Sequence, residues 1–152
     1  MRLLVTSDSH RAAGNLLDIV ELHREDSDVL FLGDGEHDLE NVRMLYPDLH
    51  ILQVAGNCDR GSDLPAWGTA KLGGKTVLYT HGHPFHVKFG LAELEQAARD
   101  AQADICLFGH THQQMTDYRD GLYLMNPGAV AEGRYGMVDI TPGGIMLLPC
   151  RL

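Results

Sequence analysis

Five segments of the sequence place an aspartate, an asparagine or histidines directly after a run of apolar residues. They are Asp8-Ser9-His10, Gly33-Asp34, Gly56-Asn57, His81-Gly82-His83 and Gly109-His110-Thr111-His112. Carboxylate, amide and imidazole groups without a thiolate suit divalent ions such as Mn²⁺, Fe²⁺, Co²⁺, Ni²⁺ or Zn²⁺. The residue types therefore predict a metal site, provided that the fold brings the five segments together.

Taken singly, each segment has an ordinary structural explanation. Asp8 and His10 point to the same side only where the chain is extended, and Gly56-Asn57 is a common turn pair. A lone histidine in a loop is more often hydrogen-bonded than bound to a metal. The histidines outside the five segments are therefore assigned structural roles: His23, His37, His50 and His86. Five strand ends of this composition are better explained by one shared site than by separate coincidences.

The spacing of apolar residues predicts the elements that position the first three segments. Short apolar runs at 3–6, 28–32 and 51–55 predict three strands, each of which ends at one of the polar segments. Helical spacing predicts surface helices over 12–25 and 39–45, the second closed by Pro47. Three consecutive strand ends thus each carry a side chain that can bind a metal.

The second half of the chain is richer in predicted hairpins. Runs at 70–72 and 76–79 flank Gly73-Gly74 and predict a tight hairpin that leads into His81. A helix over 91–101 and a strand over 105–108 lead into Gly109. After these, only strands are expected, at 115–118, 122–125, 136–140 and 145–148. Helices concentrated early and hairpins late predict an α/β fold of two sheets packed face to face, with helices outside.

Composition limits the function without defining it. The 152 residues suit a single domain spanning 1–152, and the net charge of −9 disfavours tight binding to long nucleic acid. No apolar run approaches the roughly 20 residues that span a bilayer, and the first residues lack a signal-peptide core. We therefore expect a cytoplasmic protein. The odd number of cysteines predicts free thiols, with Cys106 and Cys150 in the core.

In this order, the polar segments resemble the motifs of the calcineurin-like metallophosphoesterases, and among these the small, single-domain YfcE-like phosphodiesterases. The family pattern is Asp-x-His, Gly-Asp, Gly-Asn-x-Asp/Glu, a lone His and Gly-His-x-His. This sequence carries it as Asp8-Ser9-His10, Gly33-Asp34, Gly56-Asn57-Cys58-Asp59, His81 and Gly109-His110-Thr111-His112. The resemblance covers nearly the whole chain and implies a four-layer αββα sandwich, which agrees with the two predicted sheets.

The resemblance also implies a dinuclear metal centre. The implied ligands fall into two groups that share one residue: Asp8, His10 and His112 for one ion, Asn57, His81 and His110 for the other, and Asp34 for both. Two ions about 3.5–4 Å apart bind phosphoryl oxygens and lower the pKa of a bridging water. The expected reaction is hydrolysis of a small phosphodiester by a metal-bridging hydroxide, with Mn²⁺ as the first expectation for the metal.

One position departs from the commonest family pattern. Cys58 stands where many members have a histidine that contacts the phosphate or protonates the leaving group. A thiol with a pKa of about 8.5 is a poorer proton donor than an imidazolium, so good leaving groups are expected to be favoured. His83 is the candidate substitute acid, with a purely structural role as the alternative. Asp59 is expected to orient a ligand histidine, and Arg11 and Arg60 either contact phosphate or remain solvated.

Two other functions occur on similar chains. A eukaryotic retromer subunit that resembles this fold serves as a non-catalytic scaffold, but here all seven ligand positions keep ligating residues. The nuclease branch of the family carries further domains and a basic surface that this sequence lacks. The expected partner is therefore a small phosphate ester, not a membrane or a long nucleic acid, and a homo-oligomer is left open.

Overall fold

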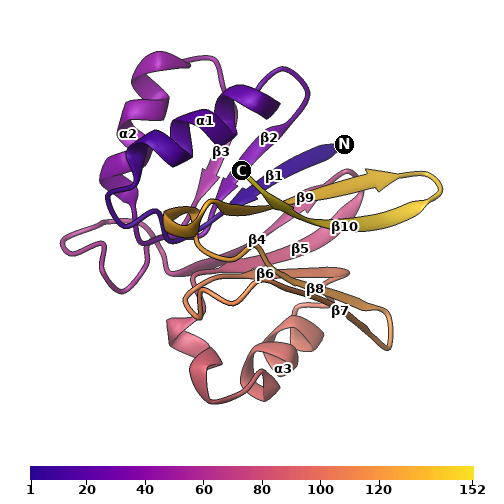
Figure 1. The fold of residues 1–152 in the computed structure, drawn as a ribbon. Coiled ribbons are helices and arrows are strands. Elements are labelled where there is room, and N and C mark those ends of the chain that lie inside the picture. The colour runs from indigo at the N-terminus through magenta and orange to yellow at the C-terminus, as the bar shows by residue number, and fades with distance from the viewer.

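The computed structural model describes residues 1–152 as two five-stranded sheets that lie face to face (Figure 1). The first sheet has the order β10-β9-β1-β2-β3, formed by Gly144–Arg151, Arg134–Thr141, Arg2–Thr6, Asp28–Phe31 and Ile51–Gln53. The second has the order β4-β5-β6-β8-β7, formed by Trp67–Leu72, Lys75–Thr80, Ile105–Phe108, Leu122–Asn126 and Met115–Arg119.

Helices cover the outer face of each sheet and complete four layers. Helices α1 (Ala13–His23) and α2 (Glu36–Leu45) lie on the first sheet, and α3 (Ala92–Asp100) lies on the second (Figure 1). Three apolar clusters fill the spaces between the layers. One lies between the sheets, one beneath α1 and α2, and one beneath α3, with Leu30, Leu39 and Leu94 as respective members. The predicted four-layer αββα fold is confirmed.

Strand direction decides where the polar segments meet. Strands β1, β2 and β3 run parallel, so their carboxyl ends share one edge of the first sheet. Strands β5, β6 and β8 also run parallel and end at one edge of the second sheet. Loops at the carboxyl ends of parallel strands are the usual place for binding residues in such sheets. No helix is long and apolar enough to cross a membrane.

The structure differs from the sequence-based expectations at several element bounds, and three differences have a clear physical reason. Helix α2 begins at Glu36 and not at Leu39. The prediction missed the first turn because this turn is polar and the apolar spacing starts only at Leu39. The last third of the chain is not made of strands alone, since Val130–Glu132 forms a 3₁₀ turn, η3. Cys106 is buried as predicted, but Cys150 is only partly buried because it lies on β10, the edge strand of its sheet.

Candidate metal centre

The carboxyl-terminal edges of the two sheets are joined by hydrogen bonds between their loops. The Nδ1–H of His81, after β5, donates to the carbonyl oxygen of Leu32, after β2, at 2.7 Å. The backbone N–H of His110, after β6, donates to Oδ2 of Asp8, after β1, at 3.1 Å. Because the Leu32 carbonyl can only accept, the proton of a neutral His81 sits on Nδ1 and the lone pair of Nε2 faces the loops.

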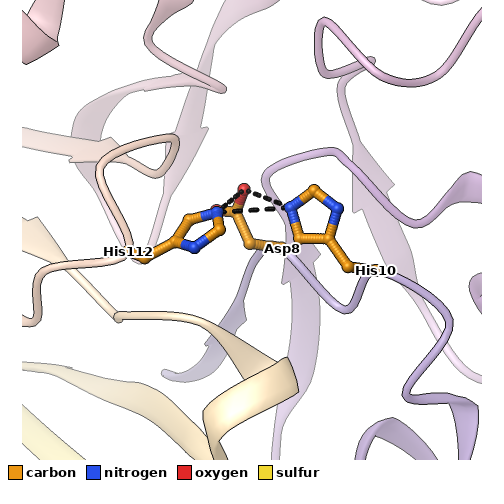
Figure 2. Close-up of side chains that lie close together, drawn as sticks. All are labelled: Asp8, His10 and His112. Atoms are coloured by element: carbon orange, nitrogen blue, oxygen red, sulfur yellow. Dashed lines mark hydrogen bonds and ion pairs between the residues drawn. The ribbon is translucent and has the colours of Figure 1, made fainter.

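The first cluster consists of Asp8, His10 and His112 (Figure 2). Oδ1 of Asp8 lies 3.3 Å from Nε2 of His10 and 3.1 Å from Nε2 of His112. The two histidine nitrogens are themselves 3.2 Å apart. Asp8 is fully buried, whereas the side chains of His10 and His112 are 33% and 40% exposed. This cluster therefore has a buried base and an open rim.

The second cluster is centred on His81. Its Nε2 lies 3.0 Å from Oδ1 of Asn57, 3.1 Å from Nδ1 of His110 and 3.3 Å from Oδ2 of Asp34. The same Asp34 oxygen lies 3.6 Å from Nε2 of His10 in the first cluster. Asp34 thus stands between the two clusters, where a shared ligand is expected.

A third group of donors includes the cysteine. The Sγ of Cys58 lies close enough to His10 and Asp34 that the three side chains could hold one ion together. Its backbone N–H also donates to Oδ1 of Asp34 at 2.8 Å. The backbone therefore supplies a contact to Asp34 that is independent of the Cys58 side chain. Cys58 itself is exposed.

The backbone is strained at the predicted ligands themselves. Five of them have a positive φ: Asp8 (57°), His10 (42°), Asp34 (59°), His110 (72°) and His112 (60°). Residues with a Cβ rarely adopt this left-handed conformation, and it persists only where the surrounding structure holds it. Such strain concentrates at functional sites, so its position supports a site at these loops.

Close approach of the loops explains the glycines that flank the ligands. A Cβ on Gly109 would lie 2.1 Å from Oγ of Ser7, and one on Gly56 would lie 2.0 Å from Oδ1 of Asp34. Neither neighbour can withdraw freely, because Ser7 donates to Oδ2 of Asp8 at 2.5 Å and Asp34 is buried. Glycine is therefore required at both positions.

The electrostatics of the clusters also favour a bound cation. Asp8 and Asp34 are buried, and their only ion-pair partners are histidines. A buried carboxylate needs a compensating positive charge. Although burial acts in the opposite direction, the hydrogen bond and charge of His81 hold the pKa of Asp34 well below its usual range. Burial and the charge of His81 lower the pKa of His110 to about 4, which keeps this ring neutral and its lone pair available near pH 7.

The spacing of the donor atoms fits metal ligation. Atoms that each lie about 2.1 Å from one ion are about 3.0–3.4 Å apart in octahedral or tetrahedral geometry. The spacings are 3.1–3.3 Å in the first cluster and 3.0–3.3 Å around His81. The histidine and aspartate clusters are thus consistent with a site for two metal ions, whose identity this donor set leaves open.

The role predicted for Asp59 is wrong. Instead of orienting a histidine, its carboxylate accepts hydrogen bonds from four backbone N–H groups, those of Asp34, Gly35, Glu36 and Gly56, at 2.8–3.1 Å. Three of these groups lie at the start of α2, which has no side-chain cap within its own sequence. Asp59 therefore fixes the Asp34 and Asn57 loops to each other, a function that the motif spacing did not indicate.

The remaining predicted residues lie around the clusters. The ring centroid of His83 is 5.3 Å from that of His81 and 6.1 Å from that of His110, and the buried Nδ1 of His83 has no hydrogen-bond partner. Burial and the charge of His81 lower the pKa of His83. Arg11 and Arg60 are exposed and form no ion pair with a carboxylate. The structure thus brings His83 to the site and leaves both arginines solvated.

Sequence reasoning missed several residues that hold these loops. Asn126 is buried and donates to the Gly109 carbonyl and to Thr111 Oγ1, both at 3.0 Å. In the turn η3, the N–H groups of Val130 and Ala131 donate to the carbonyls of Ser7 and Asp8. The sequence around Asn126 indicated only a turn. The signal that could have identified Asn126 is its position directly after the apolar run 122–125, the same pattern as in the five polar segments.

Comparison with known proteins identifies the family. Residues 1–141 match the calcineurin-like phosphoesterase superfamily domain. The chain belongs to this superfamily. Within it, the chain is 31% identical over 131 residues to the probable metallophosphoesterase YsnB of Bacillus subtilis, a match that covers 86% of this chain and 75% of YsnB. The family resemblance expected from the motifs is thereby confirmed.

Other relatives include a protein named as a phosphodiesterase and one named for vacuolar protein sorting. Phosphodiesterase YfcE of Escherichia coli is 29% identical over 103 residues, which cover 59% of this chain and 52% of YfcE. Vacuolar protein sorting-associated protein 29 of Schizosaccharomyces pombe is 37% identical over 90 residues, 59% of this chain and 47% of that protein. The solved structure of a novel archaeal phosphodiesterase has a TM-score of 0.79 at 18% identity, with 99% and 100% of the two chains covered, and supports the fold.

Proposed function

We propose that the protein is a phosphodiesterase that uses two divalent metal ions to hydrolyse small phosphodiesters. The observation that carries this proposal is the position of Asp34, whose Oδ2 lies 3.6 Å from Nε2 of His10 and 3.3 Å from Nε2 of His81. One buried carboxylate thus faces both histidine clusters. Membership of the phosphoesterase superfamily supports the same reaction class.

The seven predicted ligands would hold the two ions in the groups already described: Asp8, His10 and His112, then Asn57, His81 and His110, with Asp34 shared. When bound, two such ions supply Lewis acidity toward the phosphoryl oxygens and lower the pKa of bound water, so that it can ionise near neutral pH. Mn²⁺ is the first metal to test, because the carboxylate, amide and imidazole donors of the site suit it. The protein itself supplies a fixed geometry, since hydrogen bonds such as that from His81 to Leu32 set the ligand orientation.

The side chains around the clusters suggest which substrates suit the site. Burial, together with the charge of Asp34, raises the pKa of the Cys58 thiol, so Cys58 is a poor donor of a proton to a leaving alkoxide. His83 is the alternative candidate donor, with a buried, unpartnered Nδ1. A diester carries one negative charge fewer than a monoester dianion, which favours it in a protein of net charge −9. We therefore assign preference to diesters with good leaving groups.

Metal stoichiometry tests the dinuclear part of the proposal. The purified protein, stripped with chelator and reloaded with Mn²⁺, is expected to retain two ions per chain by elemental analysis after gel filtration. The expected number follows from two donor clusters joined by Asp34. A stoichiometry of one or less under saturating Mn²⁺ contradicts the proposal.

A series of aryl phosphodiesters and alkyl phosphomonoesters tests the substrate part. Without a strong proton donor, the rate should depend steeply on the pKa of the leaving group, and activated aryl diesters should react faster than alkyl monoesters. The variant Cys58→His should flatten this dependence and raise activity on poor leaving groups by up to about 10²–10⁴-fold. A flat dependence in the native protein, or an unchanged slope in the variant, would instead indicate that another group such as His83 already protonates the leaving group.

The alternative function is a non-catalytic scaffold with this fold. The similarity to vacuolar protein sorting-associated protein 29 over 90 residues is the observation that favours it. The seven ligand positions argue against it, because a scaffold has no need for buried carboxylates and strained loops. Absence of metal-dependent hydrolysis of both diesters and monoesters, in a protein shown to be folded, would favour the scaffold.

A further inference from the structure

A buried carboxylate outside the predicted ligand set holds the loop that carries His10. Asp38 lies in the first turn of α2 and is 7% exposed. Its Oδ2 accepts hydrogen bonds from Oγ–H of Ser9 at 2.5 Å and from the backbone N–H of Arg11 at 3.0 Å. These donors belong to the residues on either side of His10. A single carboxylate oxygen therefore fixes the chain before and after this ligand.

The contact acts on the most strained part of the loop. His10 and Arg11 are consecutive residues with φ of 42° and 73°. A residue with a Cβ keeps such a conformation only when its surroundings hold it there. The backbone N–H of His10 also donates to the Asp34 carbonyl at 3.1 Å, but this neutral hydrogen bond is weaker than one to a carboxylate. Asp38 therefore supplies the strongest hydrogen bonds to the residues on either side of His10.

The start of α2 also connects this loop to two others. Asp34 lies two residues before the start of the helix, and the Asp59 carboxylate accepts hydrogen bonds from the N–H groups of Gly35 and Glu36 from the loop that carries Asn57. Asp38 adds the His10 loop to the same helical turn. Three of the five predicted ligand segments are thus fixed to one end of α2, without any contribution from the second sheet.

We propose that Asp38 is a positioning residue for the first metal cluster, in which it holds His10 in the orientation required beside Asp8 and His112. This inference rests on the proposed function, because it assumes that the first cluster binds an ion. A simpler role would be to stabilise α2 as an acidic residue in its first turn. The two roles differ in what they predict for metal binding. A residue that only stabilises the helix leaves the affinities of the folded protein for metal unchanged.

Removal of Asp38 should weaken the binding of one ion and leave the binding of the other unchanged. His81 and His110 come from the second sheet, and His81 is fixed by Leu32 rather than by α2. Loss of a hydrogen-bonding partner that orients a ligand typically costs 10–100-fold in metal affinity. We therefore expect Asp38→Ala to lower the metal affinity of the first cluster by about 10–100-fold. The affinity of the His81 cluster should change by less than about threefold, because a lost contact affects groups within its own network.

Calorimetric titration with Mn²⁺ alone, and absorption spectra with Co²⁺ alone, test this on the full chain. Wild type is expected to show two binding events. Asp38→Ala should retain one unchanged event and one weakened event, with altered Co²⁺ bands for the weakened site only. Asp38→Asn keeps an oxygen acceptor and should bind nearly as wild type. Ser9→Ala removes one of the two hydrogen bonds and should fall between wild type and Asp38→Ala.

Asp104→Ala is the matched control. Asp104 also accepts a backbone hydrogen bond with a carboxylate oxygen, from Thr76 N–H at 2.8 Å, but it does so at the opposite ends of β5 and β6. Both metal affinities should be unchanged in this variant. Circular dichroism of the metal-free proteins establishes that each variant is folded. If Asp38→Ala is unfolded, the order of Asp38→Asn and Ser9→Ala still decides the question.

The outcomes separate this inference from the function on which it rests. Two events in wild type with unchanged affinities in Asp38→Ala, or equal weakening of both events, would overturn the role of Asp38 alone. Fewer than two events in wild type would instead contradict the dinuclear centre. Selective weakening with recovery in Asp38→Asn supports positioning, because a general loss of stability would not distinguish between the two clusters.

Discussion

The two histidine clusters of the site are held in different ways. His81 is completely buried, and its Nδ1 is fixed by the Leu32 carbonyl at 2.7 Å. His10 and His112, by contrast, are 33% and 40% exposed, and their rings pack against each other with centroids 5.0 Å apart. The cluster around His81 is therefore preorganised by the core, whereas the cluster seen in Figure 2 is shaped by two loops.

This difference predicts how the two proposed metal ions would behave. A ligand whose orientation is fixed before binding loses less conformational freedom, so its site binds more tightly. The His81 cluster should thus hold a resident ion, and the cluster of His10 and His112 should hold one that exchanges more readily. The open rim of the cluster of His10 and His112 is also where a substrate can approach without displacing core residues.

Removal of the residue that joins the clusters should have the largest effect. Asp34→Asn takes away the charge that faces both His10 and His81. Because two-metal catalysis is worth several kcal/mol, kcat/KM for an activated aryl diester should fall by about 10³-fold or more. The measurement is steady-state kinetics in saturating Mn²⁺, with circular dichroism to verify folding. Activity within tenfold of wild type would mean that the two clusters do not act as one site.

The fold could be predicted from sequence because local signals were strong. Short apolar runs such as Leu3 to Thr6 ended at polar segments, and the Gly73-Gly74 pair sat between two strand patterns. The beginning of α2 was missed because its first turn contains polar residues that carry no apolar spacing. That turn is capped by Asp59, a residue 23 positions beyond Glu36, which local sequence does not reveal.

The candidate site was predictable only as a set of residue types. The chain brings all seven predicted ligands to one edge of the two sheets, but their metal-binding roles remain predictions. Sequence did not reveal the positive φ of ligands such as His10 and His110, since glycine and not histidine normally marks that conformation. Nor did it reveal Asn126, whose hydrogen bonds to Gly109 and Thr111 join its strand end to a loop 15–17 positions earlier in the sequence.

Single substitutions in each cluster sharpen the comparison. His81→Ala should weaken the tighter of two Mn²⁺-binding events by about 100-fold, because a core-fixed donor is lost. His112→Ala should remove a half-exposed donor and weaken the other event by about tenfold. Calorimetric titration with Mn²⁺ measures both.

The comparison fails if the two variants behave alike. Equal weakening of both binding events in both variants would mean that the ions bind as one cooperative unit, not as a preorganised and an adaptable site. His23→Ala serves as the control, since His23 contacts Tyr135 at 3.0 Å, away from the ligand loops, and should leave both affinities unchanged.

The smallest effect is expected at Cys58, which stands between the clusters without being needed by either. Its contribution to Asp34 comes from the backbone N–H, at 2.8 Å, and this hydrogen bond survives in Cys58→Ala. The thiol accepts a weak hydrogen bond from Asn57 Nδ2 at 3.6 Å. A lost neutral hydrogen bond costs about 0.5–1.5 kcal/mol, so activity on an activated diester should fall by less than about tenfold.

Comparison of Cys58→Ala with Asp34→Asn, on the same substrate and with the same Mn²⁺ loading, gives this prediction its discriminating power. The thiol lies close to donor atoms of both His10 and Asp34, so geometry alone allows it to act as a metal ligand. As a thiolate ligand it would hold an ion, and its removal would abolish hydrolysis as Asp34→Asn does. Burial and the charge of Asp34 raise its pKa, however, which opposes formation of a thiolate. Near-complete loss of activity in Cys58→Ala would therefore make Cys58 an eighth ligand. The thiol, and not Asp34 alone, would then connect the two clusters.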